Sequence, residues 1–157
     1  AVPLTDDQLS RLADALRDRY LGAAAQGYRD MLDRVTSPDD VLTTFGDVLA
    51  FAADLQRSHR GYYRLTLDRL PDDEVSWASA VREQMVADFS ATIRSVGLDA
   101  SPSIEFVFSL VIEQVHAILA GLQSDGPDRD ERLRHLTRMA GLYVADAFGL
   151  DPGDLPS

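Results

Sequence analysis

Apolar residues recur along this chain at the spacing of an α-helix, and no segment alternates apolar and polar residues as a half-buried β-strand would. Thr5 and Gln8 have the spacing of a capping box, and the apolar residues after them follow one face of a long helix that is expected to end near Val35. Further helical stretches fill the rest of the sequence. The pattern predicts an all-α fold of about six helices, arranged as a single domain over residues 1–157.

Proline, glycine and capping residues predict where the later helices begin and end. Ser37 and Pro38 are expected to begin the second helix. Gly97 is expected to end the fourth helix in a left-handed conformation, and the tail GLDPGDLPS to form a loop. After the long first helix, the sequence predicts helices over about 37–56, 62–70, 72–96, 101–122 and 128–148.

The fifth predicted helix is apolar around nearly its whole circumference. Phe106, Leu110 and Ala117 lie on one side. The other side carries Phe108, Ile112, Val115, Leu119 and Leu122. One side can join the domain core, and the other needs cover of its own. A short turn makes the fifth and sixth helices antiparallel neighbours, so together they present more apolar surface than a soluble monomer leaves in water. We therefore expect a twofold homodimer whose four-helix interface uses residues 104–122 and 130–148.

The charge of the chain limits its partners. Its 157 residues include 26 acidic and 15 basic residues, and every basic residue is Arg, so the formal net charge is -11. Such a field repels phosphate backbones and anionic membranes, so this chain alone is not expected to bind nucleic acid or a membrane. The N-terminal stretch AVPLTDDQLS lacks the features of a signal peptide, and no apolar run reaches the roughly 20 residues of a spanning helix. These features predict a cytoplasmic protein.

No pattern in the sequence predicts an enzyme. The absence of cysteine excludes a disulfide framework, a thiolate zinc site and a Cys nucleophile. No glycine-rich phosphate loop, nucleophile elbow or Ser/His/Asp arrangement is recognisable.

The sharpest chemical signal is Glu113 followed three residues later by His116, inside the apolar run FVFSLVIEQVHAILAGL. Glu and His at this spacing form half of the ligand set of di-iron helical bundles, but the chain has too few other Glu residues to complete such a set. The expected role is a polar pair at a helix interface, and no metal or other cofactor is predicted. Its partner would be Arg82 or Arg94 if it faces a pocket, and Arg138 if it faces the dimer interface.

The segment His59-Arg60-Gly61-Tyr62-Tyr63-Arg64-Leu65 resembles a helix junction in the C-terminal regulatory domain of TetR-family transcriptional regulators. The order of the predicted helices is similar to that domain: a long connecting helix, a triangle of helices, and two antiparallel helices that dimerise. The N-terminal helix-turn-helix of the family is absent from this chain. The resemblance implies a domain that binds a small effector between its middle helices and signals through its first helix to DNA-reading modules.

The middle helices carry the aromatic and polar residues expected of such a pocket. We expect a small, largely apolar ligand to contact Phe51, Tyr63, Trp77, Val81, Met85, Phe89, Phe106, Leu110, Glu113 and Gln114. Two alternatives stay open at this point: a helical-bundle metal protein of the di-iron type, and a dimeric interaction domain without a ligand.

Overall fold

The computed structural model describes residues 2–60, 72–122 and 126–155. These segments contain helices and no β-strand, which confirms the all-α fold class. The elements are α1 (Asp6–Leu32), α2 (Asp40–Ser58), α4 (Asp72–Ser95), α5 (Ile104–Gly121), α6 (Arg129–Phe148) and the 3₁₀-helix η1 (Pro152–Asp154). The short helix predicted before Pro71 lies outside the described residues. None of the described helices is both long and apolar enough to cross a membrane.

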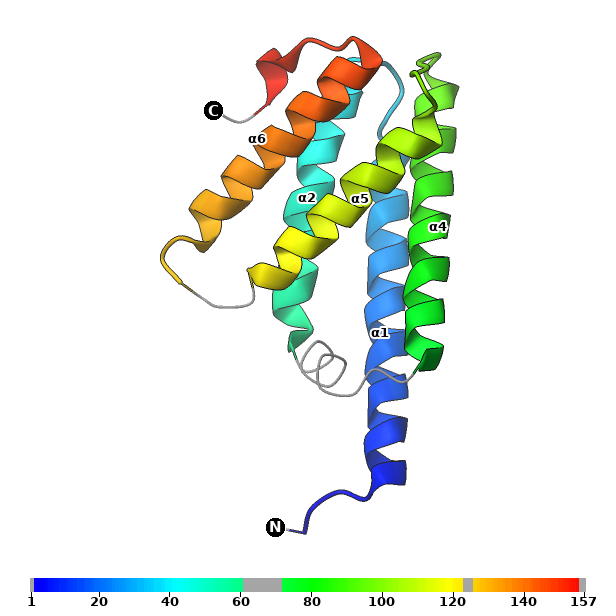
Figure 1. Ribbon diagram of the computed structural model, residues 1–157, viewed down its shortest axis with the longest axis vertical. Helices are drawn as coiled ribbons and strands as arrows, with labels where there is room; N and C mark the ends of the chain where they lie inside the picture. The colour runs from blue at the N-terminus through cyan, green and yellow to red at the C-terminus, as the bar shows by residue number, and fades with distance from the viewer. Residues whose placement is uncertain (1, 61–71, 123–125, 156–157) are drawn as a thin grey trace.

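The helices form one bundle in which α2 is central (Figure 1). α1 and α4 stand upright along the long axis, and the N-terminal half of α1 extends below the other helices. α5 crosses in front of α2, and α6 lies beside α5 and runs in the opposite direction. α2 contacts α1, α5 and α6, while α4 packs mainly on α5. The last two long helices are therefore antiparallel neighbours on one side of the bundle.

Two predicted helix-end signals are confirmed. The Thr5 hydroxyl accepts a hydrogen bond from the Gln8 backbone N–H at 3.2 Å, and the Gln8 side chain accepts one from the Thr5 backbone N–H at 2.9 Å, which completes the capping box before α1. Gly97 has φ of 80°, the left-handed conformation that ends a helix most easily at glycine.

The start of α2 differs from the prediction. Ser37 and Pro38 form a turn instead of the first helical residues, and the helix begins at Asp40. The Asp40 carboxylate accepts hydrogen bonds from the backbone N–H groups of Thr36 and Ser37, both at 2.9 Å, and from their hydroxyls at 3.0 Å. The backbone bond from Thr36 is the largest of several that lower the pKa of Asp40. A carboxylate inside the first turn thus replaces the expected serine cap.

Two other helix boundaries and the structure of the tail also differ from the prediction. α1 ends at Leu32, before Val35, and α5 begins at Ile104 with Ser103 as its capping residue, later than the predicted start at Ser101. The tail was predicted to be a loop, but it forms η1 and buries Leu155 against α6. A Cβ atom on Gly141 would lie 2.4 Å from a Leu155 methyl carbon, so glycine at this position makes room for the tail.

The core draws on every described α-helix except the first half of α1. α2 buries most of one face, and α5 and α6 contribute the large apolar side chains that are almost wholly excluded from solvent, namely Ile104, Val107 and Val144. α1 buries little along its 27 residues, and within it only Ala24 counts as buried. Its amphipathic C-terminal half therefore depends on a small number of close contacts with α2 and α4.

The closest of these contacts joins α1 and α2 at Gly27. A Cβ atom at this position would lie 2.1 Å from the ring atom Cζ of Phe51, so the absence of a side chain allows the ring to lie on the α1 backbone. Phe51 also makes an edge-to-face contact with Tyr28, with ring centroids 5.3 Å apart. Gly22, one and a half turns earlier, has nothing within 4 Å of the same position.

We expect Gly27→Ala to lower the free energy of unfolding by about 1 to 2 kcal/mol, because overpacking against the Phe51 ring outweighs the better helix propensity of alanine. Gly22→Ala is the matched control in the same helix. It should raise stability by about 0.5 to 1 kcal/mol, since only the propensity term applies there. Denaturant unfolding of both variants measures the difference, and equal stabilisation by the two substitutions would contradict the close approach.

Candidate functional site

The residues of the sequence-predicted pocket fall into two groups. Phe51 and Phe89 both contact the ring of Tyr28, and Met85 packs half-buried against the core. On α5, by contrast, four predicted site residues are exposed: Phe106, Leu110, Glu113 and Gln114. Val81 is half-buried on α4, Tyr63 lies outside the described residues, and so does the side chain of Trp77. The structure brings Phe51 of α2 and Phe89 of α4 together around Tyr28, but the predicted residues of α5 face outward.

Glu113 and His116 are both exposed on α5 in the single chain, so neither lies inside a pocket of the described residues. Partial desolvation and the nearby charge of Arg82 lower the pKa of His116. Arg94, the other predicted partner on α4, forms an ion pair with Glu105 at the start of α5 instead. Among the described residues there is no group of three or more side chains able to hold a metal ion.

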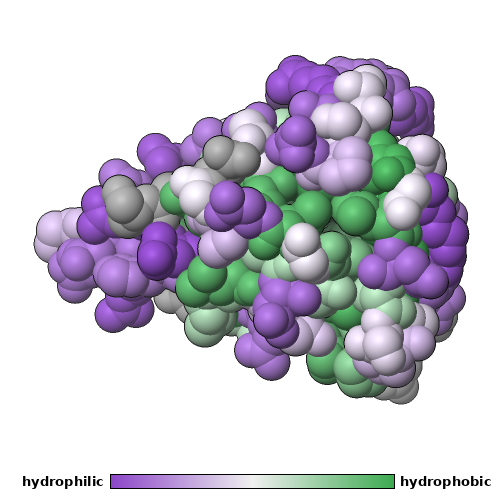
Figure 2. Space-filling view, turned by 90° about the horizontal axis from the view of Figure 1, so that it is seen from above, coloured by the Kyte–Doolittle hydropathy of each residue, from purple (hydrophilic) through white to green (hydrophobic). Residues whose placement is uncertain are grey.

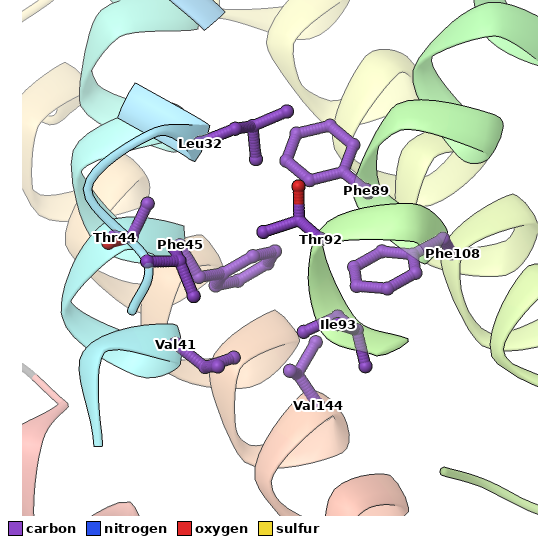
Figure 3. A pocket seen from close by; sticks show the side chains of 10 residues that line it. Leu32, Val41, Thr44, Phe45, Phe89, Thr92, Ile93, Phe108 and Val144 are labelled. Atoms are coloured by element: carbon purple, nitrogen blue, oxygen red, sulfur yellow. The ribbon is translucent and has the colours of Figure 1, made fainter. Parts of the chain in front are cut away.

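An apolar cleft, called the upper cleft here, lies where α1 ends and α2 begins (Figure 3). Its lining residues come from α1, α2, α4, α5, α6 and the α1–α2 connection. They are Leu32, Val35, Val41, Thr44, Phe45, Phe89, Thr92, Ile93, Phe108 and Val144. The cleft has an accessible volume of about 20 Å³, the room of roughly one water molecule. Figure 2, which looks onto the upper end of the domain, shows apolar side chains gathered in the middle of this end and hydrophilic ones around them.

Phe89 is the residue that the upper cleft shares with the sequence-predicted pocket. Its ring stacks on Phe108 of α5 at a centroid distance of 5.4 Å and contacts Tyr28 of α1 at 6.4 Å. Phe108 in turn contacts Phe148 of α6 at 5.8 Å. Burial, together with the neighbouring Tyr20, raises the pKa of Tyr28, so this ring stays neutral. A chain of aromatic rings therefore links the wall of the upper cleft to three helices.

A second surface lies on the outside of α5 and α6. Five large apolar side chains there are 37% to 53% exposed, and we call them the outer face: Phe106, Leu110, Met139, Leu142 and Tyr143. Beside them a groove of about 620 Å³ runs between the C-terminal half of α5 and the N-terminal half of α6. Its floor includes Ile118, Leu122 and Leu136, and its rim includes charged side chains such as Glu131 and Arg132. Both helices thus carry uncovered apolar surface on the same side of the bundle.

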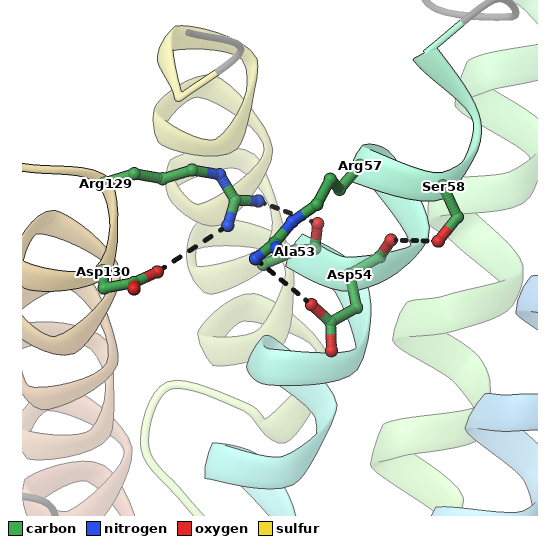
Figure 4. Close-up of polar contacts among 6 residues, drawn as sticks. All are labelled: Ala53, Asp54, Arg57, Ser58, Arg129 and Asp130. Carbon is green, nitrogen blue, oxygen red and sulfur yellow. Dashed lines mark hydrogen bonds and ion pairs between the residues drawn. The ribbon is translucent and has the colours of Figure 1, made fainter. Parts of the chain in front are cut away.

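Sequence reasoning missed a buried polar junction that joins α2 to α5 and α6, formed by Ala53, Gln56, Leu119 and Arg129. The Arg129 side chain is 8% exposed, and its Nη2 donates to the Ala53 carbonyl oxygen at 3.0 Å (Figure 4). The Gln56 side-chain amide donates to the Leu119 carbonyl oxygen at 2.7 Å. α2 therefore holds the end of α5 and the start of α6 through two side-chain-to-backbone bonds.

The junction was hard to find from the sequence for different reasons at its two ends. Arg129 belongs to the tract QSDGPDRDE, whose composition is that of an exposed turn, so nothing marked it as buried. Gln56 stands one turn after Ala53 on the apolar face of α2, and this spacing was a usable signal. Two atoms of the junction, Gln56 Oε1 and Arg129 Nη1, are buried without a hydrogen-bond partner. Arg129 Nη1 lies 4.0 Å from a carboxylate oxygen of Asp130, beyond hydrogen-bond distance.

No protein-family model matches this chain, and neither a curated protein nor a solved structure matches it at a significant level. Its function is therefore inferred from the arrangement of the described residues and from the resemblance of 59–65 to a regulator domain. Most of that segment lies outside the described residues.

Arg129→Ala should lower the free energy of unfolding by about 2 kcal/mol, because it leaves the buried Ala53 carbonyl oxygen without this donor. Arg134→Ala, an exposed arginine on the same helix, should change stability by no more than about 0.5 kcal/mol. Denaturant unfolding of the two variants distinguishes a buried anchor from a general effect of removing positive charge. Equal losses in both would contradict the junction.

The lowered pKa of His116 predicts that the folded chain loses stability in mild acid. Its pKa in the folded chain is lowered, so the unfolded chain takes up the proton more readily as pH falls through the ordinary His value of about 6.5. The stability that neutral His116 contributes to the folded chain is fully lost once the pH is below the pKa of His116 in the folded chain. We expect His116→Gln to reduce the fall in unfolding free energy between about pH 7.5 and pH 5.5, measured by denaturant titration at each pH. An unchanged pH dependence in the variant would contradict the lowered pKa.

Proposed function

We propose that this chain is a cytoplasmic dimerisation and effector-binding domain that resembles the C-terminal regulatory domain of TetR-family transcriptional regulators. In this proposal it forms a homodimer through α5 and α6 and binds a small, largely apolar molecule. It does not bind DNA by itself, because the chain is strongly acidic. The observation that carries the proposal is the uncovered apolar outer face on two neighbouring antiparallel helices.

The exposed fractions of the outer-face side chains support a second copy of this chain as the partner. Phe106 is 46% exposed, Met139 53% and Leu142 41%, and each lies on a helix whose opposite side already belongs to the core. Two such helices from each of two copies make a four-helix interface, which is a common way to bury apolar surface of this shape. The twofold axis would place the outer face of one copy against the outer face of the other.

The charges beside the outer face are compatible with that arrangement. Glu113 and Asp146 are acidic, whereas Arg132 and Arg138 are basic, and all four are exposed on α5 or α6. In a twofold interface, acidic side chains of one copy can approach basic side chains of the other. The net charge of -11 gives two copies a general repulsion, so a mixed-sign surface is the favourable place for them to meet.

Leu142→Glu should convert the homodimer to a monomer of 17.3 kDa, because it places a charge in the apolar interface. Leu12→Glu is the matched control, since Leu12 is 42% exposed but lies on α1, away from the outer face. Sedimentation equilibrium at micromolar concentration measures both. A wild-type protein that sediments as a monomer would overturn the dimer, and dissociation by Leu12→Glu as well would show that the effect is not specific to the outer face.

A further inference from the structure

We infer that the upper cleft is the site of an uncharged, mainly aliphatic molecule that carries one hydroxyl group. This inference rests on the proposed effector-binding function and gives that function a place and a ligand class. It differs from the sequence-based site, because the cleft lies at the upper end of the bundle and shares only Phe89 with the predicted pocket.

The lining of the cleft determines the class of ligand. Of its ten lining residues, Thr44 and Thr92 are polar and none is charged. The Thr92 hydroxyl donates to the backbone carbonyl oxygen of Asp88 at 3.1 Å, so its remaining capacity is to accept a hydrogen bond. A ligand that donates a hydrogen bond to this oxygen and is otherwise apolar fits these groups. An anion does not, because it would enter an apolar cleft in a strongly acidic chain without a positive partner.

The size of the cleft indicates how a ligand enters. An accessible volume of about 20 Å³ does not hold a molecule of several carbons, so neighbouring side chains must move. Leu32 and Val35 are half-buried and stand at the last residue of α1 and in the connection to α2. Ile93 and Val144, on the far side, are buried in the core. Figure 3 shows Thr92 between Leu32 and Ile93. Opening of the cleft is easiest on the Leu32 side, because the side chains there are only half-buried.

Phe89 connects the cleft to α1 and α5, so a bound ligand affects both helices. Its ring lies in the wall of the cleft and touches Tyr28 of α1 and Phe108 of α5. A ligand that separates the end of α1 from α4 changes the contact of Phe89 with Tyr28. A shift of the Phe89 ring then changes its stacking on Phe108 as well, because close-packed rings do not deform continuously. The cleft is thereby coupled to α1 and, through Phe108, to the helices of the outer face.

Straight-chain primary alcohols of four to ten carbons are the probes, with the carboxylic acids of the same lengths as the matched series. The wild-type protein should melt at a higher temperature with alcohol present, by mass action. Affinity should rise about fourfold for each added carbon until the chain outgrows the cleft. The acids should bind at least about tenfold more weakly than the alcohols, because they are charged at neutral pH. Calorimetric titration gives the affinities.

Three variants locate the binding. Thr92→Leu fills the cleft and removes the acceptor, so it should weaken alcohol binding more than about tenfold. Thr43→Leu is its control, because Thr43 is exposed on α2 and does not line the cleft. Leu32→Ala enlarges the cleft and should shift the best-binding alcohol to a longer chain. This third variant keeps the inference testable if Thr92→Leu does not fold, and circular dichroism checks the fold of each.

The outcomes separate this inference from the proposed function. If Thr92→Leu and Leu32→Ala bind alcohols like the wild type while Met85→Ala binds them weakly, the upper cleft is not the site, and effector binding between the middle helices stands. If no alcohol raises the melting temperature of a protein that sediments as a dimer, the cleft inference is overturned and a dimeric domain without this ligand remains. If the acids bind as tightly as the alcohols, the uncharged ligand class is wrong.

Discussion

The approach of Phe51 to the backbone of Gly27 is the contact on which the position of α1 depends. Only Ala24 of α1 is fully buried, and the ring of Phe51 on Gly27 and the neighbouring Tyr28 make the closest of its contacts with α2. Tyr28 then meets Phe89, which starts the sequence of rings that passes through α5 to α6. A larger residue at position 27 would meet the Phe51 ring, which also contacts Tyr28. Small residues at helix crossings act in this way because they set the distance between two backbones.

The other end of the bundle is held by hydrogen bonds instead of rings. Arg129 and Gln56 each donate to a backbone carbonyl oxygen of another helix, and both side chains are buried. Burial of a guanidinium group costs free energy unless its donors are used, so the bond to Ala53 restricts where α6 can begin. The α5–α6 pair is thus fixed to α2 near its turn, while the rings fix it near the opposite end. The five large apolar side chains of its outer face remain 37% to 53% exposed.

Helix class and two helix-end signals were predictable because they depend on local chemistry. The Thr5–Gln8 capping box and the left-handed Gly97 need only neighbours within one turn, and both were found. The predicted start of α2 was wrong because the Asp40 carboxylate accepts hydrogen bonds from the backbone N–H groups of Thr36 and Ser37, and the helix begins only at Asp40. Arg129 and Leu155 were missed because their burial depends on residues far away in sequence, Ala53 for one and Gly141 for the other. Composition alone assigns both to exposed segments.

The same limit explains why a predicted pocket and an observed cleft differ. A helical stripe of aromatic residues shows which face of a helix is buried, but it does not show at what height along the bundle the packing is incomplete. Phe89 belongs to the stripe and to the cleft, whereas Phe106 belongs to the stripe of α5 that turns outward. The incomplete packing lies where α1 has just ended, since Leu32 at the end of α1 and Val35 in the connection to α2 line the cleft together with Phe45 and Phe89. The cleft therefore lies at a helix end above an apolar floor, and a molecule bound there lies against Phe89, whose ring contacts Tyr28 of α1 and Phe108 of α5.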